Sequence, residues 1–312
     1  MSRRLKVDQP AKLMRDGLSP CKVWLPAGDW PLVLDFLAAR FAMISRDYWH
    51  ERMQEGSVLW LDGTPIAPDT AYVAQRRLLY YRELLHESPI PFALEILHVD
   101  DDLIVVDKPH FLPTNPAGRY VMQTALTRLK QQFNEPEIAP LHRLDRETAG
   151  VLLFSRNPTT NPLYNRLFAL RQMEKVYEAV AGYRSELAFP LQRQSFLYKR
   201  EKPFFVMAER HDIAPNAETR IELIRTLSDD TAHYRLLPKT GQQHQLRVHL
   251  SALGISILND PFYPELQPDK GDDFSQPLQL LARSIAFIDP ISGERREFVS
   301  RRELGVVVGY NN

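Results

Sequence analysis

Apolar residues in the first ninety positions follow helical spacing. One helix face is predicted over 30–41 by apolar side chains at Leu32, Val33, Phe36, Leu37 and Phe41. A second helix is predicted to begin behind a capping Ser45 and to end by Gly56. Asp62-Gly63 then predicts a hairpin. The pattern indicates a small helix-hairpin module.

Beyond residue 92 the pattern becomes richer in strands. Asp100–Asp102 is a turn signal between two short apolar runs, at 94–98 and 103–106. No regular alternation of strand and helix appears, which favours an α+β fold with a mixed, mainly antiparallel sheet and helices packed against it. The remaining predicted strands are Val151–Ser155, Val176–Ala181 and His233–Leu237, and the predicted helices are Met122–Phe133, Asn161–Arg171 and Gln243–Leu253.

The two regions meet at Ser88-Pro-Ile-Pro-Phe92, where two prolines interrupt the pattern. The chain of 312 residues is long enough for two medium domains. We therefore expect an N-terminal module over 1–90 and a larger domain over 91–312.

Charge gives no global indication of a polyanionic partner. Lysine plus arginine and aspartate plus glutamate each total 39, so the net charge is zero. RNA binding would have to depend on local cationic groups, each of which is equally well explained as a solvated surface. These groups are Arg3, Arg4 and Lys6; Arg193, Lys199, Arg200 and Lys202; and Arg295, Arg296, Arg301 and Arg302.

Several classes of protein are disfavoured by composition. Cys21 is the only cysteine, and the polar N-terminus lacks the apolar core of a signal peptide, so we expect a cytoplasmic protein without an internal disulfide. No apolar run is long enough to span a bilayer. The histidines lack metal-ligand spacing, and no glycine-rich phosphate loop is present. We expect no metal, no cofactor, no obligate protein partner and a monomer.

The strongest chemical candidate is Asp145, in the run His-Arg-Leu-Asp-Arg-Glu-Thr-Ala-Gly over 142–150. The run leads directly into an apolar strand, so it predicts a charged turn at a strand edge. A neighbouring guanidinium from Arg143 or Arg146 would keep the carboxylate ionised for nucleophilic attack. Taken alone, the same residues also fit a surface ion pair.

The run resembles the motif that carries the nucleophile in the RluA-type family of pseudouridine synthases. Two further blocks are similar to that family in the same order, Lys175–Ala179 and Thr240–His249, and a weaker one is Ile104–Pro109. The resemblance spans nearly all of 95–265. It implies a pseudouridine synthase fold with a bent central sheet and a cleft along its middle. The N-terminal module similarly resembles an alpha-L (S-four-type) RNA-binding domain, although a structural extension fits it equally well.

The resemblance implies roles for individual residues. The catalytic set would be Asp145 as nucleophile, Tyr177 stacking on the target base near the proton-removal step, and Arg247 pairing with Asp145 in a buried, bidentate contact. Without the resemblance, Tyr177 would be read as a core tyrosine and Arg247 as a surface arginine. Arg143 would enter the space left by the extruded base, and the other expected substrate-binding residues are His142, Leu246 and Lys108.

The chain also departs from the family pattern. Gln242 and Gln243 replace an arginine and a threonine, which puts one phosphate or ion-pair contact in doubt. Ala149 replaces a serine, and the segment after Lys108 lacks the usual small residues. At Asn259 a glycine is usual, but asparagine tolerates left-handed backbone, so we expect that turn to survive.

The resulting hypothesis is an isomerase that converts specific uridines of ribosomal or transfer RNA to pseudouridine. The reaction needs a carboxylate, a proton acceptor and a pocket for the detached base, but no cofactor. Whether Asp145 attacks the base or the sugar stays open. One alternative is a catalytically silent RNA-binding or ribosome-assembly factor with the same fold. Another is a hydrolytic N-glycosidase, which would need a further acid or base that the sequence does not offer.

Overall fold

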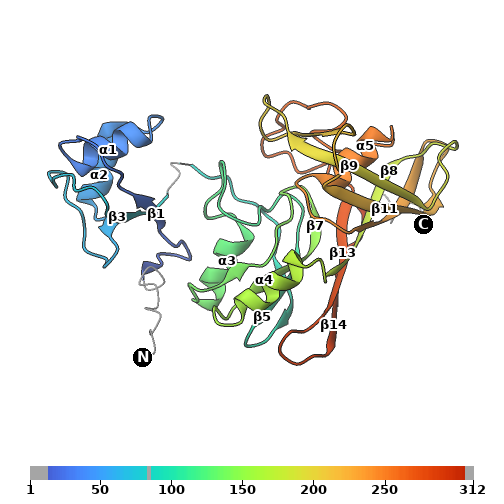
Figure 1. Ribbon diagram of the computed structural model, residues 1–312, viewed down its shortest axis with the longest axis horizontal. Coiled ribbons are helices and arrows are strands. Elements are labelled where there is room, and N and C mark those ends of the chain that lie inside the picture. Colours follow the sequence, from blue (N-terminus) through green and yellow to red (C-terminus); the bar gives the residue numbers. More distant parts are fainter. Residues whose placement is uncertain (1–12, 83–85, 306–312) are drawn as a thin grey trace. The chain divides into compact units, whose positions relative to one another are not determined.

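The computed structural model describes residues 13–82 and 86–305, which form two compact units (Figure 1). The first unit comprises Met1–Glu87, Ala117–Met122 and Thr127–Glu137, and the second comprises Ser88–Pro116, Gln123–Leu126 and Ile138–Asn312. The expected cationic group Arg3, Arg4 and Lys6 lies outside the described residues. Each unit is described below by itself.

Two helices and a three-stranded sheet make up most of the first unit. Helix α1 spans Val33–Arg40 and α2 spans Arg46–Gln54, which confirms both predicted helices. The hydroxyl of Ser45 caps α2 by accepting a hydrogen bond from the Tyr48 amide at 3.1 Å. The sheet has the order β1-β3-β2, and its strands are Cys21–Trp24 (β1), Arg77–Tyr80 (β3) and Val58–Trp60 (β2).

The predicted hairpin at Asp62-Gly63 is present but short, since the Trp60 amide donates to the Thr64 carbonyl at 2.8 Å and the Ile66 amide to the Val58 carbonyl at 2.9 Å. The Gly63 amide donates to the Trp60 carbonyl at 2.9 Å, and the chain returns to form a single bridge between Leu59 and Pro65. The strand that pairs with β2 is β3, which the sequence pattern did not predict. The core of this sheet and its helices is apolar and includes Leu25, Val33, Phe36, Leu37, Trp49 and Leu78.

Helix α3, Ala125–Phe133, confirms the helix predicted from Met122 with a later start. Its first two residues belong to the second unit, where their amides donate to the carbonyls of Pro113 and Thr114. The rest of α3 belongs to the first unit. There Lys130 Nζ donates to Ser19 Oγ at 2.8 Å, and the Gln131 amide donates to the Asp16 carbonyl at 2.8 Å.

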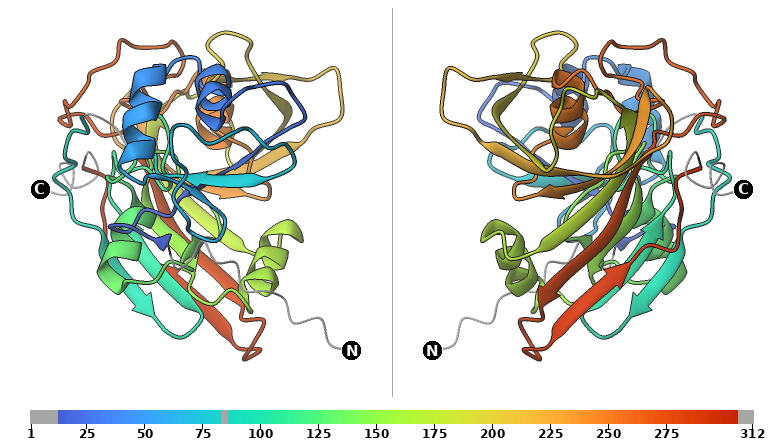
Figure 2. Two further views of the ribbon diagram at one scale, coloured as in Figure 1. Left: turned by 90° about the vertical axis from the view of Figure 1, so that its left-hand side faces the viewer. Right: turned by 90° about the vertical axis from the view of Figure 1, so that its right-hand side faces the viewer.

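The second unit is built on an 11-stranded sheet (Figures 1 and 2). The path is β10-β9-β11-β12-β8-β13-β7-β5-β4, with β14 paired to β13 and β6 to β7. Every pairing except β13 with β7 is antiparallel, which confirms the predicted α+β class with a mixed, mainly antiparallel sheet. The strands are Glu95–Val99 (β4), Leu103–Lys108 (β5), Ala139–Pro140 (β6), Ala149–Ser155 (β7), Glu174–Gly182 (β8), Leu191–Lys199 (β9), Met207–Arg210 (β10), Ala217–Thr226 (β11), Thr231–Pro238 (β12), Leu280–Ile288 (β13) and Arg295–Val299 (β14).

Helices α4 (Asn161–Ala169) and α5 (Gln245–Ala252) confirm two further predictions and pack against this sheet. Tyr164 of α4 joins a core cluster with residues of β5, β7 and β13. Leu246 and Leu250 of α5 join another with residues of β8, β11, β12 and β13. The two helices therefore bury different parts of the sheet, and α5 carries the Arg247 region.

Strand β13 joins the two halves of the sheet, because its first residues pair with β7 on one side and with β8 on the other. Leu281 and Ala282 pair in parallel with Ala149 and Gly150 of β7, while the same strand pairs antiparallel with β8. Gly150 has φ +112°, and a Cβ atom there would lie 2.2 Å from the Ala282 carbonyl oxygen. A glycine is thus required for β7 to begin at this place, directly after the turn that bears Asp145.

Three other expectations bear on the described residues. No helix within 13–82 and 86–305 is long and apolar enough to cross a membrane. Over the same ranges, no group of three or more His, Cys, Asp or Glu side chains is placed to hold a metal ion. Asn259 adopts φ +61°, which confirms the expected left-handed turn.

Candidate active site

Asp145 lies in the turn that joins β6 to β7, and this turn is held from both sides. Thr114 Oγ1 donates to the Leu144 carbonyl at 2.9 Å and accepts from the Leu144 amide at 3.2 Å. The buried ammonium of Lys108 donates to the carbonyls of Pro109, Leu112 and Arg146 at 2.8 to 3.3 Å. These bonds fix the backbone on each side of Asp145 before any substrate binds.

The turn forms one wall of a cavity in the second unit. Five of the predicted site residues line this cavity: Arg143, Asp145, Tyr177, Leu246 and Arg247. Tyr177 comes from β8, Leu246 and Arg247 come from α5, and the segment 240–244 closes another side. Residues separated by about a hundred positions in sequence are thus brought to one concave site.

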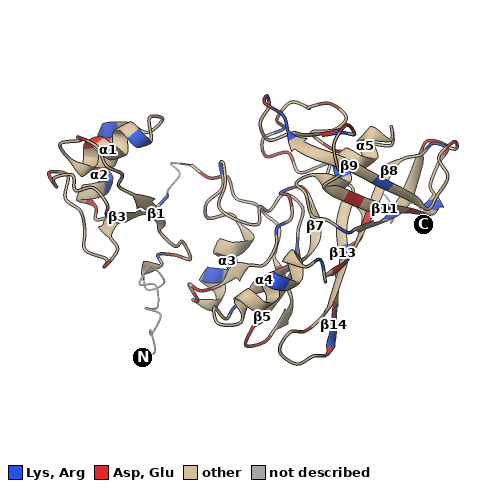
Figure 3. Cartoon of the chain, in the orientation of Figure 1, with Lys and Arg blue, Asp and Glu red and all other residues tan. Residues whose placement is uncertain are grey.

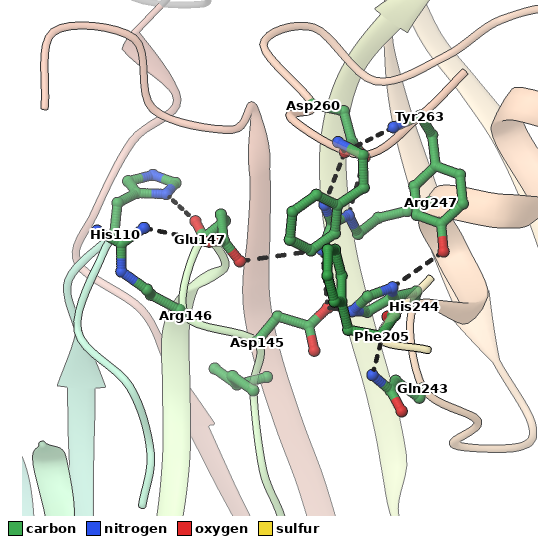
Figure 4. Close-up of polar contacts among 12 residues, drawn as sticks. His110, Asp145, Arg146, Glu147, Phe205, Gln243, His244, Arg247, Asp260 and Tyr263 are labelled. Carbon is green, nitrogen blue, oxygen red and sulfur yellow. Dashed lines mark hydrogen bonds and ion pairs between the residues drawn. The ribbon is translucent and has the colours of Figure 1, made fainter. Parts of the chain in front are cut away.

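The guanidinium of Arg247 is 1% exposed and faces three carboxylates (Figure 4). Its Nη1 donates to Asp145 Oδ2 at 3.3 Å, and the same atom is 4.0 Å from Glu147 Oε2. Its Nε and Nη2 donate to the two oxygens of Asp260 at 2.8 and 2.6 Å. The expected bidentate pair with Asp145 is therefore wrong, because Asp260 takes the two-bond geometry and leaves a single bond for Asp145.

His244 is the second group beside the Asp145 carboxylate. Its Nε2 lies 3.8 Å from Asp145 Oδ2, and its Nδ1 lies 2.9 Å from the Tyr263 hydroxyl. That hydroxyl accepts the Met207 amide at 2.8 Å, so its own proton is free to be donated to Nδ1. The network therefore assigns the neutral ring the tautomer that carries its proton on Nε2, the side that faces Asp145.

Electrostatics keep Asp145 ionised. Burial alone would raise the pKa of its carboxyl, but the His244 ring in its protonated form and the permanently charged Arg247 guanidinium together outweigh burial, and the pKa lies below its ordinary value. Burial also lowers the pKa of His244. At neutral pH the ring is then mainly neutral, and Arg247 is the permanent cation next to the carboxylate.

Tyr177 has the opposite shift. Burial, and then the negative charge of Asp145, raise the pKa of its phenol well above the ordinary value. The phenol therefore stays protonated at neutral pH. Tyr177 thus brings a neutral aromatic ring, not a phenolate, to the lining of the cavity.

Known proteins are similar to this chain over most of its length. Residues 102–252 match a family model described as RNA pseudouridylate synthase. The dual-specificity RNA pseudouridine synthase RluA of Pasteurella multocida is 33% identical over 218 residues, which cover 66% of this chain and 91% of that protein. The chain belongs to the RluA-type family of RNA pseudouridine synthases. It is accordingly an isomerase that converts uridine in RNA to pseudouridine.

Further members of the pseudouridine synthase family are similar over most of the chain. An RNA pseudouridine synthase of Synechocystis is 32% identical over 234 residues, covering 74% of this chain and 79% of that protein. The structure of human RNA pseudouridylate synthase domain containing 1 superposes with a TM-score of 0.55 at 23% identity, covering 70% of this chain and 86% of that one. At that identity the match shows the shared fold.

Two of the expected substrate-binding residues take structural positions in the synthase. Lys108 is not among the residues that line the cavity around Asp145, because its ammonium is turned to backbone carbonyls. His142 accepts the Leu153 amide on Nε2 at 3.1 Å and stacks on Phe168, and burial lowers its pKa to about 3. The neutral ring of His142 contributes to a neighbouring hollow that also includes Arg143, Lys175 and Tyr177.

Four residues of this site were not predicted from the sequence: Glu147, His244, Asp260 and Tyr263. Glu147 and His244 stand inside the two recognised motifs, so their proximity to Asp145 and Arg247 in sequence was a usable signal. Asp260 and Tyr263 lie beyond residue 252, where the family match ends. Only the folded loop after α5 brings them to Arg247 and His244.

Proposed function

We propose that this synthase isomerises uridine in structured ribosomal or transfer RNA, with Asp145 as the catalytic nucleophile. The observation that carries the proposal is the buried Arg247 guanidinium, which donates to an ionised Asp145 on the wall of a cavity shared with Tyr177. An ionised, oriented carboxylate is what covalent attack or stabilisation of a sugar cation requires.

Each neighbour has a distinct task in this proposal. Tyr177 stacks on the target base, since its raised pKa leaves a neutral phenol with a flat face toward the cavity. Arg247 is a positioning residue that holds Asp145 while Asp260 holds Arg247. Arg143 is exposed at the rim, where it lines both the cavity and the neighbouring hollow, and is suited to fill the space of an extruded base.

The reaction proceeds by breaking the N-glycosidic bond, turning the uracil within the cavity and joining its carbon 5 to the sugar. Carbon 5 loses its proton to solvent, and nitrogen 1, whose bond to the sugar has broken, takes up a proton, so that the product is an isomer of the substrate. None of these steps intrinsically requires a metal or a redox cofactor. Leu246, which is 7% exposed, supplies an apolar surface against which the detached base can turn.

The class of RNA is proposed from the relatives. One relative is named a dual-specificity RNA pseudouridine synthase, and another, from Saccharomyces cerevisiae, is named a mitochondrial tRNA pseudouridine(32) synthase and is 27% identical over 234 residues. The first unit, with two helices and a three-stranded sheet, is proposed to be an alpha-L-type RNA-binding module.

Tritium release tests the proposal. RNA labelled with tritium at carbon 5 of uridine is prepared from cells that lack the protein and is incubated with wild type, Asp145→Ala or Asp145→Asn. We expect release to water by the wild type alone, with both variants folded and still binding RNA. Release by Asp145→Asn at the wild-type rate would refute the role of Asp145, and free uracil in place of pseudouridine would indicate a glycosidase.

A further inference from the structure

The loop between β9 and β10 carries an aromatic side chain that the fold leaves in solvent. Phe204 is 74% exposed, more than any other large apolar residue among those described in the second unit. Lys199, Arg200 and Lys202 precede it and are all exposed, and Glu201 is the one acidic residue among them. Figure 3 shows Lys and Arg positions, in blue, in the loop next to β9. An exposed ring beside three cations is not explained by the packing of the sheet.

The base of this loop is firmly built. The Arg200 amide donates to the Val206 carbonyl at 3.0 Å, and the Val206 amide donates to the Pro203 carbonyl at 3.1 Å. Val206 is 2% exposed and Met207 5% exposed, and both belong to a core cluster with Tyr263. Phe204 is thus presented by an anchored turn.

The loop is also continuous with the wall of the active site. The ring of Phe205 lies 5.3 Å from that of Phe262, which lies 5.5 Å from that of His244. The Gln243 side chain donates to the Phe205 carbonyl at 3.4 Å (Figure 4). Because His244 is beside Asp145, an RNA strand whose uridine enters the cavity would pass this loop.

The side chains of this loop favour RNA over an apolar protein surface as its binding partner. A phosphate chain complements three cations, and an unpaired base offers a π-face to an aromatic ring. An apolar protein surface would gain from Phe204 but would have to desolvate the cations beside it. We propose that Phe204 stacks on an unpaired base near the target uridine while Lys199, Arg200 and Lys202 contact the adjoining phosphates. This inference rests on the proposed function, since the RNA is the same substrate.

The test measures RNA affinity in an Asp145→Asn background, which prevents turnover. The RNA is the fraction, transfer or ribosomal, from which the wild type releases tritium. Phe204→Ala removes the stacking on one base, so its Kd for RNA is expected to rise by about 5- to 100-fold. Phe204→Tyr keeps an aromatic ring, so its Kd is expected to stay within about 3-fold of that of its parent. Ile291→Ala, at another exposed apolar residue of the second unit, is the matched control and should leave Kd unchanged.

Two further variants separate stacking from other contacts. Phe204→Leu keeps an apolar side chain without a π-face and should behave like Phe204→Ala. Replacing Lys199, Arg200 and Lys202 together by glutamine should reduce the salt slope of log Kd by about 2. Equal affinity of Phe204→Ala and its parent, or of Phe204→Leu and its parent, would overturn the proposal. Absence of tritium release by the wild type would instead refute the proposed function.

Discussion

Arg247 is shared by two carboxylates, and the two contacts differ in geometry. Asp260 binds the guanidinium through two bonds and also accepts the amides of Phe262 and Tyr263. Asp145 has one bond of 3.3 Å and keeps its remaining acceptor capacity. Because Asp260 takes two of the three bonds, it fixes the position of Arg247. Arg247 can then hold Asp145 through one carboxylate oxygen and leave the other oxygen of Asp145 unoccupied by Arg247.

Asp260→Asn should therefore cost stability, whereas Asp145→Asn should cost catalysis. Removing one partner of a buried ion pair destabilises by about 3–5 kcal/mol, because the other charge is left uncompensated. In Asp145→Asn the Arg247–Asp260 pair remains, so we expect a loss under about 1 kcal/mol. Urea denaturation at pH 7 gives both free energies of unfolding. Equal stability of the two variants would contradict the division of roles.

At this scale the motifs predicted which residues meet, but not how they bond. Asp145, Tyr177 and Arg247 reach one cavity as expected from their motifs. The bidentate partner of Arg247 was misassigned because Asp260 is thirteen residues away in a loop whose course no local pattern determines. The position of Lys108 was missed for a similar reason, since three carbonyls from different turns surround its ammonium.

At the scale of elements, the junction of β7 with β13 depends on one glycine. Gly150→Ala would place a Cβ atom against the Ala282 backbone at a φ that L side chains rarely adopt. We expect a loss of about 2–5 kcal/mol from strain and overpacking together. Gly271→Ala is the matched control, since Gly271 has φ +59° with no atom within 4 Å of the added Cβ. If the denaturation midpoint fell equally in the two variants, the loss of stability would come from backbone strain at positive φ and not from the close approach of the Cβ atom to Ala282.

A half-buried carboxylate, that of Glu178, links β8 to its neighbours on both sides. Glu178 accepts two bonds from Arg283 of β13, at 2.9 and 3.0 Å, and lies 3.2 Å from His233 of β12. Burial would raise the pKa of Glu178, but these bonds lower it from 4.5 to about 2. Because the folded pKa is depressed, the stabilisation is complete above pH 4.5 and is lost as the pH falls toward 2.

Glu178→Gln should consequently lower the free energy of unfolding by about 2 kcal/mol at pH 7, and the difference should shrink below pH 4.5. Glu303→Gln provides the control, since Glu303 contacts the same Arg283 at 3.2 Å but its side chain is 57% exposed. That variant should change stability by less than about 1 kcal/mol. Urea titrations from pH 7 to pH 3 measure both, and a Glu178→Gln difference independent of pH would refute the assignment.

The elements also differ in how well their patterns predicted them. Helix α1 was predicted from its apolar periodicity, α2 from the capping Ser45 and the following Gly56, and β7 from its continuous apolar run. Helices α4 and α5 were predicted as well. Strands β9 and β11 were not, since their exposed faces carry many charged and polar residues. Pairing of β13 with both β7 and β8 is a tertiary property that no local pattern encodes.

At the scale of the whole molecule, the first unit is not a continuous stretch of chain. Its residues 117–122 and 127–137 come after the second unit has begun, so a single boundary near residue 90 does not separate the two. Val121 is 1% exposed in a cluster with Leu18, Leu59 and Leu79. Lys130 and Gln131 of α3 bond to Ser19 and Asp16.

A fragment of residues 88–312 should therefore lose order in α3 while keeping its sheet. Without residues 13–82, Val121 loses its apolar partners and the second half of α3 loses two hydrogen bonds, so its local opening becomes easier. Amide hydrogen exchange over 127–133 should accelerate on the order of tenfold or more relative to the full chain. The amides of β5, which pair with β4 and β7 inside the second unit, serve as the internal control and should keep their protection. Unchanged exchange over 127–133 would mean that α3 is stabilised by the second unit alone.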